Sequence, residues 1–74
     1  MPKLGIFSGR DVCSILTDAG FSHVRTRGSH AVMQSVDVEG ISRTVAVPLH
    51  GTVKKGTLKS IIRQSGLDQV LFMK

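Results

Sequence analysis

The feature that most constrains the fold is a two-residue turn signal, Gly28-Ser29, set between two runs of strand-forming residues. A glycine at the first central position of a two-residue connection favours a type II′ turn, whose backbone twist suits a tight β-hairpin. The runs on either side, residues 21–27 and 30 to about 36, are therefore predicted to pair as antiparallel strands.

An amphipathic helix is predicted before this hairpin. Ser8 is a suitable N-cap, and Asp11 lies three residues later as a capping-box partner. Apolar residues then recur with helical spacing until Gly20, which is expected to end the helix while Phe21 folds back on its apolar face. The residues of this apolar stripe are Val12, Ile15, Leu16 and Ala19.

A third strand and a second helix are predicted after the hairpin. The strand covers residues 41–47, and Pro48 ends it because proline has no N–H for the strand ladder. The second helix is expected to begin around residues 56–57 and to end at Gly66. The residues predicted to face the core are Ile41, Val45 and Val47 from the strand and Leu58, Ile61, Ile62 and Ser65 from the helix.

A last short helical turn is predicted over residues 69–73, with Asp68 as its cap, and its apolar side chains Val70, Leu71 and Phe72 need something to cover them. The order helix, strand, strand, strand, helix indicates an α+β fold, a two-layer sandwich in which two helices cover one face of a three-stranded antiparallel sheet. Double-stranded RNA-binding domains have this architecture. With 74 residues, the chain is expected to form a single domain, residues 1–74.

Composition restricts the classes of function. Ten Lys and Arg residues against five Asp and Glu give a net charge of +5, which attracts polyanions, although plain solubility is the alternative explanation. Trp and Tyr are absent, which argues against a base-stacking platform. The single cysteine, Cys13, favours a reducing compartment. The chain has neither an apolar run of about 20 residues nor a signal-peptide core, so we expect a cytoplasmic protein that involves no membrane.

His30 is the best candidate for catalysis. A histidine titrates near neutral pH, so it can take a proton from one oxygen and return it to another. RNA carries its own nucleophile, the 2′-OH, and such a step needs no metal. The backbone amides of Gly28 and Ser29 suit the charge of a phosphorane-like transition state, and Arg25 and Arg27 add cations one strand away. The pattern leaves open which face this histidine occupies, and an ordinary surface or core-edge histidine is the alternative.

Further candidates for RNA binding follow the third strand. His50, in a constrained loop, suits a second acid or base, a phosphate ligand or a structural hydrogen-bonding residue, and its spacing favours the last. Lys54, Lys55 and Lys59, with Arg63, are predicted at or near the start of the second helix, where backbone amides add positive charge. The alternative for these cations is a solvated helix face.

Neither a metal nor a small-molecule cofactor is expected. The histidines and the cysteine have neither the helical spacing nor the CxxC knuckle of common metal sites. Motifs for nucleotide-binding loops, zinc proteases, serine hydrolases and deaminases are also absent from the sequence.

Taken in order, these motifs resemble those of the HicA family of toxins. The matching residues are Gly20-Phe21, Arg25, Gly28-Ser29-His30, Val47-Pro48-Leu49-His50-Gly51, Lys55-Gly56-Thr57-Leu58, Ile61-Ile62 and Gly66-Leu67. The resemblance implies an mRNA interferase with a double-stranded-RNA-binding-domain-like fold, no cofactor, and neutralisation by a HicB antitoxin. It also implies that His30, in the GSH motif, is the essential histidine. The family often has a second histidine directly after it, where this chain has Ala31.

The leading hypothesis is therefore a metal-independent endoribonuclease toxin that cleaves mRNA with a histidine as general acid/base and is neutralised by a HicB-like antitoxin. The alternative is a double-stranded RNA-binding module without catalysis, which uses the same fold and the same cations. A third hypothesis is an interaction protein whose basic face meets only an acidic partner chain.

Overall fold

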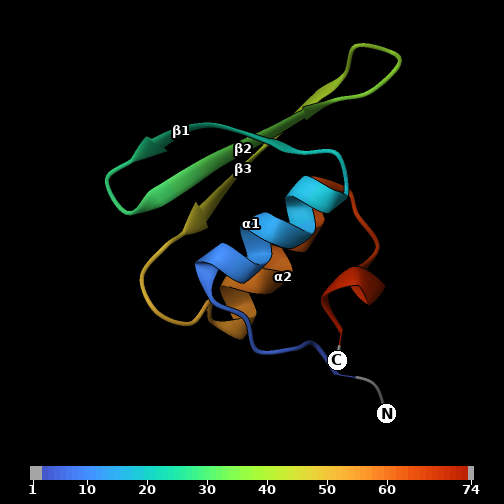
Figure 1. The fold of residues 1–74 in the computed structure, drawn as a ribbon. Coiled ribbons are helices and arrows are strands. Elements are labelled where there is room, and N and C mark those ends of the chain that lie inside the picture. The colour runs from blue at the N-terminus through green and yellow to red at the C-terminus, as the bar shows by residue number, and fades with distance from the viewer. Residues whose placement is uncertain (1–2, 74) are drawn as a thin grey trace.

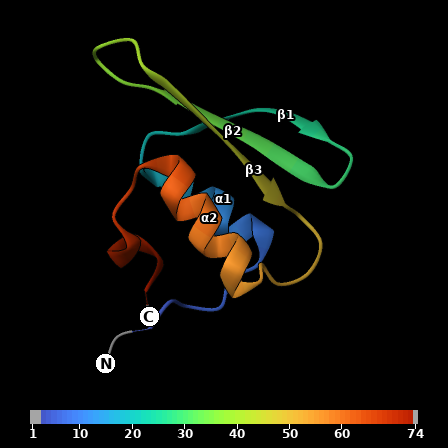
Figure 2. The same cartoon turned by 180° about the vertical axis from the view of Figure 1, so that it is seen from behind.

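Two helices cover one face of a three-stranded sheet in the computed structural model, which describes residues 3–73 (Figure 1). The elements are α1 (Gly9–Asp18), β1 (Ser22–Arg27), β2 (His30–Val36), β3 (Ser42–Pro48), α2 (Lys55–Ser65) and the 3-10 helix η1 (Gln69–Phe72). The strands are antiparallel, in the order β1-β2-β3. The view from behind shows the same two layers (Figure 2). The predicted α+β sandwich is confirmed.

Both ends of α1 form as the sequence predicts. Ser8 and Asp11 make a capping box, in which the backbone N–H of each donates to the side chain of the other over 3.1 Å. Gly20 has a φ of 103°, and the N–H of Phe21 donates to the carbonyl of Leu16 over 2.9 Å. The chain thus reverses directly after α1, and Phe21 enters the core at 3% exposure.

α2 begins at Lys55, with Lys54 at the N-cap, slightly earlier than predicted. It ends as predicted at Gly66, whose φ of 72° is left-handed. A Cβ on Gly66 would lie 2.7 Å from the guanidinium carbon of Arg43. Glycine at this position therefore allows the left-handed turn and also lets Arg43 lie over the C-terminal end of α2, where positive charge is favourable.

The hydrophobic core fills the space between the sheet and the helices. Val12 and Leu16 of α1, and Leu58 and Ile61 of α2, are at most 2% exposed, which confirms the predicted inward faces of both helices. The remaining core residues are Met33, Val45 and Val47 of the sheet and Phe7, Phe21, Val53 and Phe72 of the flanking segments.

The 3-10 helix η1 buries only one of its three apolar side chains fully. Asp68 caps it as expected, accepting from the N–H of Val70 over 3.0 Å. Phe72 is fully buried, and its ring stands edge-on to that of Phe7 with 6.5 Å between centroids. Val70 and Leu71 are 60% and 47% exposed, so nothing in the described part of the chain covers these two side chains fully. A single turn of four residues turns only one of these side chains fully inward.

The burial pattern of β2 decides which face of the sheet His30 occupies, a question that the sequence left open. Ala31 and Met33 are 3% and 1% exposed, and Met33 belongs to the core between sheet and helices. Because successive side chains of a strand point to opposite faces, His30 and Val32 point away from the helices. His30 begins the strand and is exposed, whereas Val32, with a strand on each side, is only 8% exposed.

β1 contains a bulge that the sequence did not reveal. The register of its pairing with β2 shifts between His23 and Arg25, which leaves Val24 as the extra residue. His23 does not share a face with Arg25 and Arg27, because the bulge interrupts the alternation of faces. The Nε2 atom of His23 lies 2.8 Å from the Oγ1 atom of Thr26, to which it is hydrogen-bonded.

The β2–β3 hairpin extends beyond β1. The last β1–β2 pair is Ser22 with Gln34, and the β2–β3 ladder continues past it to the loop of residues 37–41. This loop protrudes beyond the helices at the top of Figure 1. Ile41, predicted to begin the third strand on its buried face, precedes β3 and is 53% exposed. That prediction is wrong because no helix lies under this part of the hairpin.

Candidate nucleic-acid interface

The β1–β2 turn, the end of β3 and the first turn of α1 lie on one side of the molecule, and the β3–α2 loop leads from there to the first turn of α2 (Figures 1 and 2). His30 pairs with Pro48 across the sheet, and the N–H of Leu49 donates to the carbonyl of Ser29 over 2.7 Å. The motifs at residues 28–30 and 47–51 are therefore adjacent in space. We call this region the cationic end, and its basic residues are Arg10, Arg25, Arg27, His30, His50, Lys54, Lys55 and Lys59.

Gly28 has the backbone conformation that the tight turn requires. Its φ is 59°, and in the described part of the chain only glycines have positive φ, so Ser29 does not. A positive φ at the first central residue alone is the pattern of a type II′ turn. Nothing lies within 4 Å of an added Cβ at Gly28, so backbone conformation, rather than space, calls for glycine. The turn places Arg27 directly opposite His30.

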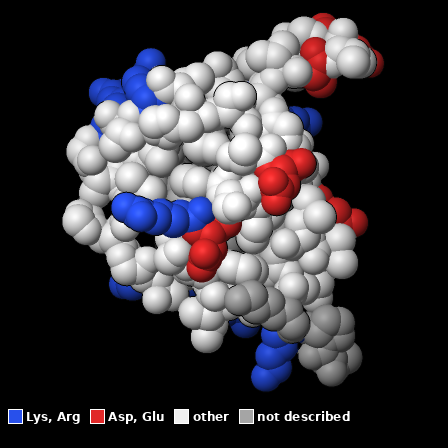
Figure 3. Space-filling model, in the orientation of Figure 1, with Lys and Arg blue, Asp and Glu red and all other residues white. Residues whose placement is uncertain are grey.

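His30 and the two arginines share the outward face of the sheet. Arg27 is the cross-strand partner of His30, and Arg25 is the partner of Val32, the next outward residue. All three charged or titratable side chains are exposed, and Figure 3 shows basic side chains gathered over β1 at this corner. Within residues 3–73 nothing is hydrogen-bonded to the His30 ring, which is therefore open to a bound molecule. An accessible imidazole beside guanidinium groups suits a phosphodiester.

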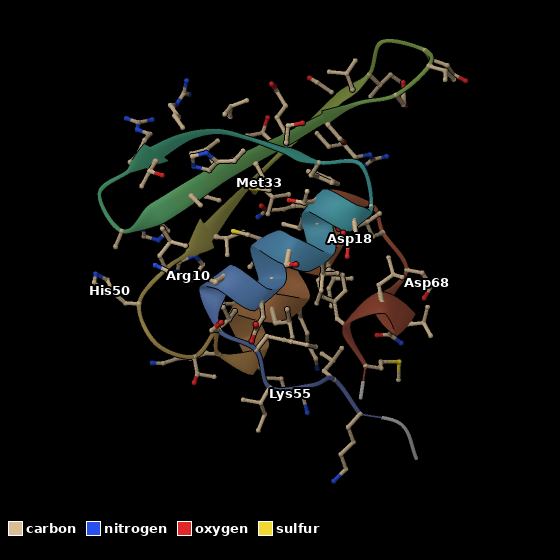
Figure 4. All side chains as sticks on the ribbon, viewed as in Figure 1. Arg10, Asp18, Met33, His50, Lys55 and Asp68 are labelled. Atoms are coloured by element: carbon tan, nitrogen blue, oxygen red, sulfur yellow. The ribbon has the colours of Figure 1, made fainter. Side chains whose placement is uncertain are left out.

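The other predicted RNA-binding residues lie on the helix side of the cationic end. His50 is exposed in the β3–α2 loop (Figure 4). Lys54 and Lys55 flank the start of α2, Lys59 follows one turn later on the same face, and all three are exposed. Since α2 covers the inner face of the sheet and His30 points outward, the candidates form two groups. We call them the sheet-face group (Arg25, Arg27, His30 and the Gly28-Ser29 turn) and the loop–helix group (His50, Lys54, Lys55 and Lys59).

Arg63 does not belong to this end. It lies in the last turn of α2, so the prediction that it accompanies the lysines near the start of that helix is wrong. It lies eight positions after Lys55, which is about 12 Å along the helix axis at 1.5 Å per residue. A cation in the last turn complements the negative end of the helix dipole, which gives Arg63 a structural reason for its position.

Acidic residues gather away from the cationic end. Asp18 ends α1, and Asp68 precedes η1. Asp37 and Glu39 lie in the protruding loop, whose acidic tip is plain in Figure 3. Asp11 is the exception, and it serves in the capping box. The described acidic side chains other than Asp11 thus lie away from the end that carries His30, which favours the approach of a polyanion to that end.

The basic side chains of the cationic end are all exposed. Two hollows of about 250 and 260 Å³ lie along α1, lined by Ile15 with Asp18, Ala19 and Leu71 in one and by Ile15 with Phe7, Asp11 and Ser14 in the other. Neither includes His30 or a lysine. An open cationic surface fits an extended polymer better than a small molecule, which is normally held in a concave site.

Other reactive groups give no second site. Among residues 3–73, no three His, Cys, Asp or Glu side chains are placed to hold a metal ion. Cys13 is half-buried beside the core, and desolvation raises the pKa of its thiol, which keeps it protonated at neutral pH and therefore a poor nucleophile. No helix within the described residues has the length and apolar character needed to cross a membrane.

One residue that shapes this end was missed by the sequence analysis. An ideal Cβ on Gly9 would lie 2.1 Å from the carbonyl oxygen of Pro48 and 2.9 Å from the Cα of Leu49. Only glycine allows the first turn of α1 to approach the end of β3 this closely. The available signal was a glycine directly after the N-cap Ser8, where a better helix former is usual.

Fold and charge together define a small α-β-β-β-α domain with an exposed histidine on a cationic surface. A family model described as "HicA toxin of bacterial toxin-antitoxin" matches residues 9–67. Because this match spans more than half of the chain, the chain belongs to the HicA family: it is a toxin of a toxin–antitoxin system, and its family implies an antitoxin partner. No curated protein matches the chain significantly.

Proposed function

We propose that this toxin is a metal-independent endoribonuclease that cleaves mRNA, with His30 as the general acid/base. The observation that supports the proposal most is the exposed His30 ring directly opposite Arg27, at the end of the molecule where basic residues gather. Membership of the HicA family adds to this support.

The chemistry needs only groups of the RNA and an imidazole. His30 takes the proton of the ribose 2′-OH, and the resulting oxygen attacks the neighbouring phosphorus while the bond from phosphorus to the 5′-oxygen breaks. The leaving 5′-oxygen receives a proton, either from the same imidazolium or from a second acid. The products are a 2′,3′-cyclic phosphate and a 5′-hydroxyl. A histidine suits both transfers because it titrates near neutral pH.

The sheet-face group supplies charge where the transition state becomes more negative. Arg25 and Arg27 hold the non-bridging oxygens of the scissile phosphate, and the amides of Gly28 and Ser29 donate to it from the turn. The 2.7 Å hydrogen bond from Leu49 to the Ser29 carbonyl supports this assignment, since it fixes the turn before any substrate arrives.

The loop–helix group binds phosphates farther along the chain of the RNA. Lys54, Lys55 and Lys59 lie on one exposed face of α2, a suitable track for a polyanion. His50 contributes a further hydrogen bond or phosphate contact beside them. In this arrangement the RNA backbone passes around the cationic end from the sheet face to the start of α2.

The antitoxin inhibits by covering the cationic end. A HicB-like partner with an acidic surface removes His30 and the arginines from solvent in the same binding event, which explains inhibition without a change of fold. This part of the proposal predicts protection of the β1–β2 turn from hydrogen exchange in the complex. A toxin–antitoxin complex in which His30 stays open to solvent would contradict it.

The test compares His30→Ala with His23→Ala. His23 is also exposed on the neighbouring strand, so its replacement is a matched control for loss of a surface imidazole. Purified proteins are incubated with labelled mRNA in EDTA, and growth inhibition is scored in cells. We expect His30→Ala to lose cleavage and toxicity, and His23→Ala to keep both.

The outcomes separate the alternatives. If the wild-type protein binds RNA in EDTA without cutting it, the double-stranded RNA-binding module is correct instead. A 3′-hydroxyl product would indicate water as the nucleophile. Absence of any salt-dependent RNA affinity would favour the interaction protein. Normal cleavage by His30→Ala would remove that residue from the mechanism.

A further inference from the structure

The first turn of α1 is fixed against the strand end that pairs with His30. Gly9 leaves no room for a side chain between α1 and the carbonyl of Pro48. The N–H of Val53 donates to the carbonyl of Phe7 over 2.8 Å, and Ser8 pairs with Thr52 in an isolated bridge. The segment that leads into α1 is therefore anchored along the β3–α2 loop, and the residue after Gly9 has a defined place at the cationic end.

Arg10 is that residue, in the first turn of α1 beside the end of β3. It is exposed, and Figure 4 shows it on the side of α1 towards the loop that carries His50. Two contacts connect it to the proposed catalytic residue: Gly9 lies against Pro48, and Pro48 pairs with His30.

Helix stability does not explain a cation at this position. Arg10 is the second residue of α1, at the positive end of the helix dipole, where a positive charge costs about 0.3–1 kcal/mol. The capping box of Ser8 and Asp11 already satisfies this terminus. The charge is thus placed against the local preference of the helix, as is typical of residues kept for binding.

We infer that Arg10 is a further RNA-binding residue, which contacts a backbone phosphate next to the scissile one from the helix side of the site. The inference rests on the proposed function for its substrate class. Gly9 lies against Pro48, the partner of His30, and Arg10 is on the side of α1 towards His50 (Figure 4), so its contact joins the sheet-face group and the loop–helix group into one continuous path for the RNA backbone. Guanidinium is suited to this role because it donates two parallel hydrogen bonds to one phosphate.

The test measures RNA affinity as a function of salt in the His30→Ala background, where substrate stays intact. Arg10→Gln is compared with Arg63→Gln, which removes the same charge from the far end of the molecule. We expect Arg10→Gln to weaken binding about tenfold and to lower the slope of log affinity against log salt by about 0.7–0.9. Arg63→Gln leaves both close to their original values. Equal effects of the two variants would overturn the inference.

Arg10→Glu gives a second measurement that does not depend on how well the first variant folds. An acidic residue in the first turn stabilises the helix, so the melting temperature of the Arg10→Glu protein is expected to equal or exceed that of the His30→Ala protein. Its RNA affinity is expected to fall below that of Arg10→Gln. Unchanged binding with intact folding would also overturn the inference. Because the readout is binding, a wild-type protein that binds RNA without cutting it would refute the nuclease and still decide the role of Arg10. No RNA binding by any variant would refute both.

Discussion

The two hairpin ends of the sheet differ in how they are held. The β1–β2 turn has two residues, and a third segment anchors it through the hydrogen bond from Leu49 to Ser29. The loop at residues 37–41 is longer and is held by its own Asp37, whose carboxylate accepts from the N–H groups of Glu39 and Ile41, each over 2.9 Å. The fixed turn is the end with the proposed chemistry, as pre-organisation requires.

Their surfaces differ as well. The anchored end is basic, whereas the protruding loop is acidic and exposes Val38 completely, with Val36 65% exposed. Tertiary contacts therefore stabilise one hairpin end and leave the other to local hydrogen bonds. The comparison teaches that the anchored hairpin end is also the basic one, and four experiments test whether the anchor and the charge serve RNA cleavage.

The largest expected effect is on the close packing of Gly9 against Pro48. Gly9→Ala places a methyl group against the backbone of Pro48, which cannot move without disturbing β3, so we expect a loss of about 3 kcal/mol in the free energy of unfolding. Chemical denaturation measures it. The matched control is Gly56→Ala in the first turn of α2, where an added Cβ meets nothing within 4 Å and a gain of about 0.5–1 kcal/mol is expected. Equal changes in the free energy of unfolding for Gly9→Ala and Gly56→Ala would contradict the close packing of α1 against the end of β3.

The next effect concerns charge at the anchored end. The double substitution Arg25→Gln and Arg27→Gln is expected to weaken RNA binding about a hundredfold and to reduce the salt slope by about 1.5–2. Fluorescence anisotropy with an uncleaved RNA, in the His30→Ala background, provides the measurement. Because both side chains are exposed, the unfolding free energy should stay within about 0.5 kcal/mol. Retained affinity would show that the outward face of the sheet is not the RNA-binding surface.

A pair of glycine substitutions compares the two turns directly. Gly28 and Gly40 both have positive φ, 59° and 82°, and both have open space for a Cβ. Alanine at either position should therefore cost about 1–2 kcal/mol of stability through backbone strain. Only Gly28→Ala is expected to slow RNA cleavage, because it changes the placement of His30 relative to Arg27. Equal cleavage by the two variants, each measured well below its melting temperature, would contradict the requirement for a fixed turn.

The smallest effect is expected at the acidic tip. Asp37→Asn with Glu39→Gln removes two negative charges and keeps an oxygen to accept the two loop N–H groups. At 0.15 M salt charges are screened over about 8 Å, so RNA affinity should change less than about twofold. The same anisotropy titration is the measurement. A tenfold gain in affinity would mean that the loop approaches the RNA, and the polarity of the molecule would need a different explanation.

Local chemistry made much of the fold predictable. The Gly28-Ser29 turn, the Ser8–Asp11 capping box and Gly66 each impose a backbone conformation on their neighbours, and each formed where expected. The inward stripes of the helices followed from their spacing. The element order then left one simple architecture, with both helices on one face of the sheet.

Features that depend on two distant segments were not predictable. The bulge after His23 shifts the register of β1 against β2, and no residue pattern within β1 indicates it. The sequence did not reveal which face His30 occupies, because the next three residues are all apolar. One of them, Val32, is buried by the neighbouring strands rather than by the core. The role of Gly9 depends on Pro48, some 40 positions away. The candidate residues could be named from sequence, but their division between two sides of the sheet could not.

The hydrogen bond from Leu49 to Ser29 has a mechanical consequence. It joins the exit of β3 to the turn beside His30 over 2.7 Å, so the two segments move together unless this bond breaks. Anything that pulls the β3–α2 loop away from the sheet must therefore either drag the imidazole with it or release the turn. A ligand seated on that loop would influence the proposed proton transfer by His30 through the end of β3 and the turn, without touching the ring.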